Sequence, residues 1–162
     1  LDPAPPFPII LVLHRKSGKD DILTNLLAGK TEMMVKEVEE KEEMLPATIY
    51  IAPPNYHLLI ENDHTFSLDA SEKVNFSRPS IDVTFQSAAE VFKENLVCLL
   101  LSGANSDGSA GLKIVKEFGG AALVQDPDSA VVSLMPESAI ANVEVGAVLK
   151  SSEMSEYINN LP

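Results

Sequence analysis

Two side chains of complementary chemistry follow two of the most apolar segments of the chain. His14 comes directly after the run at residues 8–13, and Asp107 lies in a glycine-bearing turn after the run at residues 96–101. A histidine beside an ionised aspartate can act as a general base, because the aspartate fixes the imidazole tautomer and stabilises the imidazolium. The two residues therefore predict activation of a hydroxyl nucleophile, if the fold brings them together.

The nucleophile itself is not evident from the sequence. No Gly-x-Ser-x-Gly turn occurs, and Ser102, Ser106 and Ser109 are candidates only because they lie near Asp107 in the chain. Serines at such a position more often cap the following helix or bond to the loop backbone. The single cysteine, Cys98, lies inside an apolar run, and we expect an inert core thiol there.

The elements that must position His14 and Asp107 alternate along the chain. Apolar runs predict strands at residues 8–13, 33–38, 48–52, 96–101, 121–124 and 146–149. Amphipathic segments predict helices from Asp20 and at residues 81–93, 109–118, 137–142 and 152–159. Residues 57–61 and 65–68 read as a β-hairpin.

This order predicts a three-layer α/β/α fold with a mostly parallel sheet of Rossmann-like topology and a small antiparallel hairpin. Sites on such sheets lie at the carboxyl ends of the strands. Because His14 and Asp107 both follow strands, we expect them to meet at that edge.

The length and the net charge of the chain limit the number of domains and the kinds of partner that we expect. The 162 residues suit one domain, spanning 1–162, and the net charge of −12 argues against nucleic acid as a partner. No stretch approaches the roughly 20 apolar residues that cross a bilayer, and no secretion signal is evident. A single cysteine suits a reducing compartment, so we expect a cytoplasmic protein without membrane insertion.

Five separated blocks carry a resemblance to a known family. They are Ile10-Leu11-Val12-Leu13-His14-Arg15, Tyr50-Ile51-Ala52-Pro53 with His57-Leu58, Arg78-Pro79-Ser80-Ile81-Asp82, Leu101-Ser102-Gly103-Ala104-Asn105-Ser106-Asp107-Gly108, and Gln125-Asp126 with Met135-Pro136. In this order they resemble the catalytic domain of the protein-glutamate methylesterases of bacterial chemotaxis, the CheB family. The similarity runs from the first residues to the last predicted helix.

The resemblance implies roles for particular residues. His14 and Asp107 take the places of the family's triad histidine and aspartate, and the backbone N–H at Ala104 takes the place of an oxyanion donor. The family's serine nucleophile lies on a strand before the position of Leu1-Asp2-Pro3. The resemblance thus implies that an N-terminal strand and helix of this domain are missing from the sequence.

The implied reaction is hydrolysis of glutamyl γ-methyl esters on the cytoplasmic helices of methylated chemotaxis receptors, with glutamine deamidation as a second activity. Neither a cofactor nor a metal is implied, and a receiver domain or other regulator is a further implied partner. Three departures from the family pattern stand out: Ala104 replaces a methionine, Asn105 replaces a glycine, and Lys16 replaces a proline. Asn accepts left-handed backbone angles better than most residues, which offers a reason for Asn105.

Two other readings stay open from the residues. Gly103, Gly108 and Gly111 with Asp126 loosely suggest a dinucleotide-binding turn, although their spacing is not Gly-x-Gly-x-x-Gly and Asp107 would repel a pyrophosphate. A protein that keeps this fold without catalysis and acts as an interaction module is the other alternative.

Overall fold

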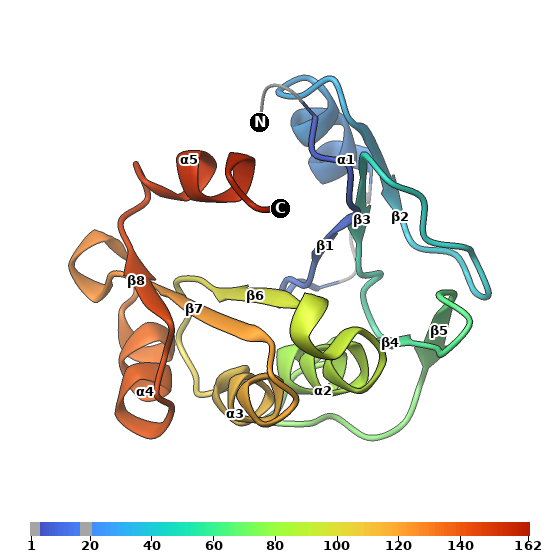
Figure 1. Cartoon of the computed structure of the whole chain (residues 1–162). Coiled ribbons are helices and arrows are strands. Elements are labelled where there is room, and N and C mark those ends of the chain that lie inside the picture. Colours follow the sequence, from blue (N-terminus) through green and yellow to red (C-terminus); the bar gives the residue numbers. More distant parts are fainter. Residues whose placement is uncertain (1–3, 17–20) are drawn as a thin grey trace.

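The computed structural model describes residues 4–16 and 21–162 (Figure 1). Its strands are β1 (Ile9–Leu11), β2 (Met34–Glu37), β3 (Thr48–Ile51), β4 (His57–Ile60), β5 (Phe66–Asp69), β6 (Val97–Leu100), β7 (Ala121–Gln125) and β8 (Ala147–Leu149). Its α-helices are α1 (Asp21–Ala28), α2 (Ile81–Phe92), α3 (Ser109–Glu117), α4 (Leu134–Asn142) and α5 (Met154–Asn159). The loop expected at residues 1–3 and the helix start expected at Asp20 lie outside the described residues.

The parallel strands form two sheets. In one sheet β3 lies between β1 and β2, and in the other β7 lies between β6 and β8, all in parallel register. The strands β4 and β5 pair antiparallel, with Leu58 opposite Leu68. The predicted three-layer α/β fold with a small hairpin is confirmed, with its parallel strands divided between two sheets.

Helix α2 joins the two halves of the core. Its Ala89 packs with β6, β7, α3 and α4, whereas its Ala88 packs with the β3 and β4–β5 region. Val12, just after β1, and Leu96, just before β6, contact both apolar clusters. The segments that carry His14 and Asp107 are therefore anchored in two adjoining apolar clusters.

The start of helix α4 differs from the prediction. Helix α4 begins at Leu134 rather than Glu137, and Pro136 lies within its first turn. Proline is tolerated there because a first-turn N–H has no partner within the helix. The sequence-based prediction started this helix after Pro136, because a proline in the interior of a helix breaks it.

Helices α2 and α3 pack closely at Gly111. A Cβ at this position would lie 2.7 Å from Phe85 Cβ and 3.0 Å from Asp82 Cα. We expect Gly111→Ala to push the helices apart and to lower the free energy of unfolding by about 1–3 kcal/mol, measured by urea denaturation. Gly29→Ala is the control, because its Cβ would meet no atom closer than 3.5 Å. Equal stability of the two variants would contradict the close packing.

The cysteine is in the place that the sequence predicted. Cys98 is buried in the apolar cluster beneath α2 and α3, and burial raises the pKa of its thiol far above the ordinary value. A thiol that resists ionisation is a poor nucleophile.

No helix in the described part of the chain is long and apolar enough to span a lipid bilayer.

Candidate active site

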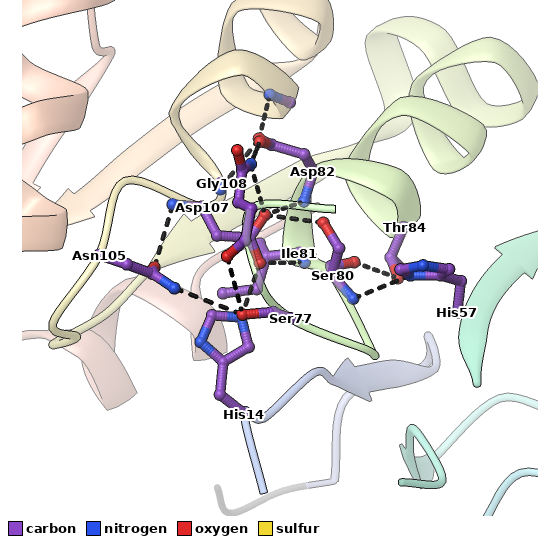
Figure 2. Close-up of polar contacts among 12 residues, drawn as sticks. His14, His57, Ser77, Ser80, Ile81, Asp82, Thr84, Asn105, Asp107 and Gly108 are labelled. Atoms are coloured by element: carbon purple, nitrogen blue, oxygen red, sulfur yellow. Dashed lines mark hydrogen bonds and ion pairs between the residues drawn. The ribbon is translucent and has the colours of Figure 1, made fainter. Parts of the chain in front are cut away.

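The structure brings the two predicted residues into direct contact. His14, in the segment after β1, has its Nε2 2.6 Å from Oδ2 of Asp107, in the loop after β6 (Figure 2). The Asp107 side chain is fully buried and the His14 side chain is 27% exposed. Residues 93 positions apart thus form a pair with one buried partner and one partner that other molecules can reach.

Asp107 is held at the start of α2 by several donors. The backbone N–H of Ile81 donates to Oδ2 at 2.7 Å, and the N–H of Asp82 donates to Oδ1 at 3.1 Å. The Ser80 hydroxyl donates to Oδ1 at 2.7 Å. Each of these groups prefers an ionised acceptor, and the positive end of the α2 dipole favours a negative charge at the same place.

These contacts determine the charge of Asp107. Burial by itself would raise its pKa, but the hydrogen bonds from His14, Ile81, Asp82 and Ser80 together outweigh burial and lower the pKa to about 2. The carboxylate is therefore ionised at neutral pH and accepts a hydrogen bond from the N–H at Nε2 of His14. That bond leaves Nδ1 of His14 as the basic nitrogen.

The segment before α2 is fixed by a second histidine. His57 is buried, and its Nδ1 accepts the N–H of Ser80 at 3.2 Å while its Nε2 lies 2.9 Å from the carbonyl oxygen of Glu72. Ser80 precedes α2 but caps none of its N–H groups, since its hydroxyl reaches Asp107 instead. The sequence placed His57 only in a hairpin and Ser80 only at a helix entrance, so these supporting roles were missed.

Asn105 links the Asp107 loop to the neighbouring turn. Its Oδ1 accepts the N–H of Asp107 at 3.1 Å, and its Nδ2 donates to the Ser77 hydroxyl at 3.3 Å. Asn105 is not among the residues with left-handed backbone angles, so the expectation that it serves such a conformation is wrong. Asn105 acts here through the hydrogen bonds of its side chain and not through its backbone conformation.

Ala104 lies exposed in the same loop. Gly103 before it is anchored through its N–H to Val132 and through its carbonyl to Met135. Within the described residues, Ala104 itself makes no hydrogen bond. Its N–H is therefore free to donate to another group.

The candidate serines have other partners. The Ser102 hydroxyl bonds to the backbone of Val132, and the Ser109 hydroxyl donates to the side-chain hydroxyl of Ser138. Within the described part of the chain, the His14 ring makes one hydrogen bond, which goes to Asp107. The structure thus brings none of the three candidate serines into hydrogen bonding with His14.

The dinucleotide reading fails at the start of α3. The N–H groups of Gly108 and Gly111, which such a turn would offer to a phosphate, donate to the Asp82 carboxylate at 2.9 Å and 2.6 Å. A phosphate would have to displace this carboxylate and approach the charge of Asp107. The glycines instead allow a protein carboxylate to come close.

Comparison with known proteins agrees with this geometry. The family model described as CheB methylesterase matches residues 1–158. A Leptospira interrogans protein is 50% identical over 154 residues, which cover 95% of this chain and 80% of that protein. The Thermotoga maritima protein-glutamate methylesterase/protein-glutamine glutaminase is 35% identical, over 96% of this chain and 46% of that protein.

A solved structure shows the same architecture. The crystal structure of the Thermotoga maritima CheB methylesterase catalytic domain superposes with a TM-score of 0.91 at 35% identity, covering 96% of this chain and 84% of that one. The chain spans less than half the length of the whole Thermotoga protein but most of its catalytic domain. With a family match across nearly all of its residues, this chain belongs to the CheB methylesterase family.

Proposed function

We propose that this chain is the catalytic part of a protein-glutamate methylesterase that hydrolyses glutamyl γ-methyl esters and, as a second reaction, glutamine side-chain amides of chemotaxis receptors. The family match and the names of the relatives support the carboxylic ester hydrolase class. The observation that carries the assignment is the hydrogen bond of 2.6 Å between His14 and the buried, ionised Asp107.

His14 and Asp107 are the proposed catalytic pair. A serine hydroxyl attacks the ester carbonyl carbon while its proton passes to Nδ1 of His14. Asp107 accepts the hydrogen bond from Nε2 and stabilises the imidazolium that forms. The N–H of Ala104 donates to the oxyanion, since it has no other partner in the described loop.

The second half of the reaction returns the enzyme to its starting state. The tetrahedral intermediate collapses, and methanol leaves with the proton from His14. Water then attacks the acyl-serine and gives its proton to the same nitrogen. The second tetrahedral intermediate then collapses, the serine oxygen takes this proton back from Nδ1, and a glutamate side chain is left on the receptor. An amide substrate gives ammonia in place of methanol.

The nucleophile in this proposal is a serine outside residues 1–162. We infer a serine on a strand–helix unit that precedes residue 1 in the full protein, so that residues 1–162 form most of one domain. Two observations support it: β1 and β6 each pair with a strand on one side only among the described residues, and the relatives are longer than this chain. A parallel strand between β1 and β6 would carry its carboxyl end to His14.

The substrate sets the proposed partners and location. CheB-family enzymes and the Myxococcus xanthus protein-glutamate methylesterase FrzG, 37% identical over 83% of this chain, support a methylated receptor as the partner. Because the methylated helices of such receptors are cytoplasmic, we propose a cytoplasmic protein. A receiver domain or a separate regulator that controls access to His14 belongs to the same proposal.

Methanol release from a methylated receptor fragment by the full-length protein tests the activity. Labelling with a fluorophosphonate, followed by peptide mapping, tests the nucleophile. We expect methanol release and a single labelled serine outside residues 1–162. A label on Ser102, Ser106 or Ser109 would overturn the placement of the nucleophile, and no methanol release would overturn the function.

A further inference from the structure

A second carboxylate lies beside the candidate pair. Asp82, in the first turn of α2, accepts the N–H groups of Gly108 and Gly111 on Oδ1 at 2.9 Å and 2.6 Å. Its Oδ2 accepts a hydrogen bond from the side-chain amide of Asn75 at 2.7 Å. This carboxylate takes no part in the proposed proton transfers, so its role needs another explanation.

The two aspartates cap each other's helices. Asp107, just before α3, accepts the N–H groups of Ile81 and Asp82 at the start of α2. Asp82, at the start of α2, accepts the N–H groups of Gly108 and Gly111 at the start of α3. Gly108 has no side chain with which to cap α3, and its φ of 96° suits glycine alone. The carboxylate from α2 supplies the missing cap.

This arrangement has an electrostatic cost. Burial raises the pKa of Asp82, and the neighbouring charge of Asp107 raises it further, against the opposing effect of the two glycine N–H bonds. The carboxylate of Asp107 is the charged group that acts on Asp82, and Lys113 lines the same surface pocket of about 310 Å³ as Asp82. A neutral side chain at position 82 would avoid the repulsion with Asp107. The benefit of a carboxylate here is therefore the geometry that it imposes on its hydrogen-bond donors.

The Asn75 contact connects Asp82 to a third segment of the chain. Asn75 lies in a turn closed by an antiparallel bridge between Val74 and Ser77, and Ser77 in turn accepts the hydrogen bond from Asn105. Asn75 Nδ2 is also 3.4 Å from Asp107 Oδ1. Asp82 thus connects three segments that surround Asp107: the turn at residues 74–77, α2 and the start of α3.

We propose that Asp82 is a positioning residue for the ester hydrolysis: by fixing the residue after Asp107 to α2, it directs the Asp107 carboxylate toward His14. The proposal rests on the proposed function for its kinetic part only. Asp82 does not touch the reacting atoms, so its loss acts on the chemical step through the geometry of the His14–Asp107 pair. A displacement of about 1 Å in such a pair costs on the order of 100-fold in rate.

Two variants of the full-length protein separate geometry from charge. Asp82→Ala removes both glycine caps, and we expect kcat for methanol release to fall on the order of tenfold to a hundredfold with KM changed less than about twofold. Asp82→Asn keeps an oxygen that can accept from Gly108 and Gly111, but its NH₂ group cannot accept from Asn75, so we expect it to recover only part of the lost kcat. Asp63→Asn, an exposed aspartate in the β4–β5 turn that also accepts backbone N–H, is the control without effect.

A measurement on the pair itself distinguishes failure of this proposal from failure of the function. The proton between His14 and Asp107 is expected to give a downfield proton resonance that shifts or broadens in Asp82→Ala and persists in Asp82→Asn and Asp63→Asn. A well-folded Asp82→Ala protein with unchanged resonance and unchanged kcat would overturn the positioning role. If the wild type releases no methanol, the resonance still decides whether Asp82 positions the pair.

A third variant covers the case in which Asp82→Ala does not fold. Asn75→Ala removes the Oδ2 partner of Asp82 in an exposed turn and leaves both helix caps in place. We expect a smaller loss of kcat, about threefold to tenfold, together with a shifted resonance. Wild-type values for both quantities in this folded variant would contradict the proposed framework.

Discussion

Replacing His14 by Gln in the full-length protein is expected to lower kcat for methanol release on the order of 10⁴-fold to 10⁶-fold. The Gln amide can still donate to Asp107, but no atom of this side chain can take the proton of the nucleophile at neutral pH. Because the His14 side chain is 27% exposed and makes one hydrogen bond within the described residues, we expect the midpoint of urea unfolding to change little.

The control for this variant is His64→Gln. His64 lies exposed in the β4–β5 turn, and the change leaves the contact between His14 and Asp107 intact. Methanol release and urea unfolding are measured on both variants with the same receptor fragment. More than about one-hundredth of the wild-type kcat in His14→Gln would remove His14 from the mechanism.

Asp107→Asn is expected to affect both activity and stability. An amide at this position can accept on one atom only, so its NH₂ group would face the donors of Ile81 or of Ser80 and Asp82. We expect kcat to fall about 10⁴-fold, because the tautomer of His14 is no longer fixed, and the free energy of unfolding to fall by about 2–4 kcal/mol.

The stability loss should depend on pH in a defined direction. The pKa of Asp107 in the folded protein, about 2, lies below its ordinary value of 3.8, so the folded state binds fewer protons than the unfolded state. The stabilisation from the charge, roughly 2 kcal/mol, is fully present above pH 3.8 and is lost as the pH falls toward 2. Wild type and Asp107→Asn should therefore differ more at pH 7 than at pH 2.5.

Urea denaturation at the two pH values measures this difference, with Asp128→Asn as the control. Asp128 is exposed in the loop after β7, and its substitution should leave stability nearly unchanged at both pH values. A stability difference between wild type and Asp107→Asn that stays constant, or grows as the pH falls, would contradict the assigned charge state.

Much of the fold and the central contact could be predicted because their signals are local. The apolar runs before His14 and Asp107 mark buried parallel strands, and the strand-end rule then places both residues at one edge. The structure places the two side chains in direct contact, as expected. The catalytic roles of His14, Asp107 and Ala104 remain predictions.

The supporting residues were not predictable in the same way. Asp82 and Ser80 reach partners more than 25 positions away, and nothing in the pattern around them distinguishes such a contact from an ordinary helix start. Asn105 was read through its backbone because a glycine was expected there, whereas its side chain bonds to Ser77 and Asp107. Side-chain hydrogen bonds between distant segments depend on tertiary geometry that no local period encodes.

The exchange of caps between α2 and α3 has a consequence for the dynamics of the site. First-turn amides of a helix have no intrahelical partner and ordinarily exchange quickly with solvent deuterium. Here the amides of Ile81, Asp82, Gly108 and Gly111 are bonded to two carboxylates from the facing helix. None of these four amides can be exposed to solvent without breaking its hydrogen bond to one of the two carboxylates. We therefore expect the four amides to exchange slowly and at a common rate. Their common hydrogen-exchange rate then measures how often Asp107 leaves its place beside His14.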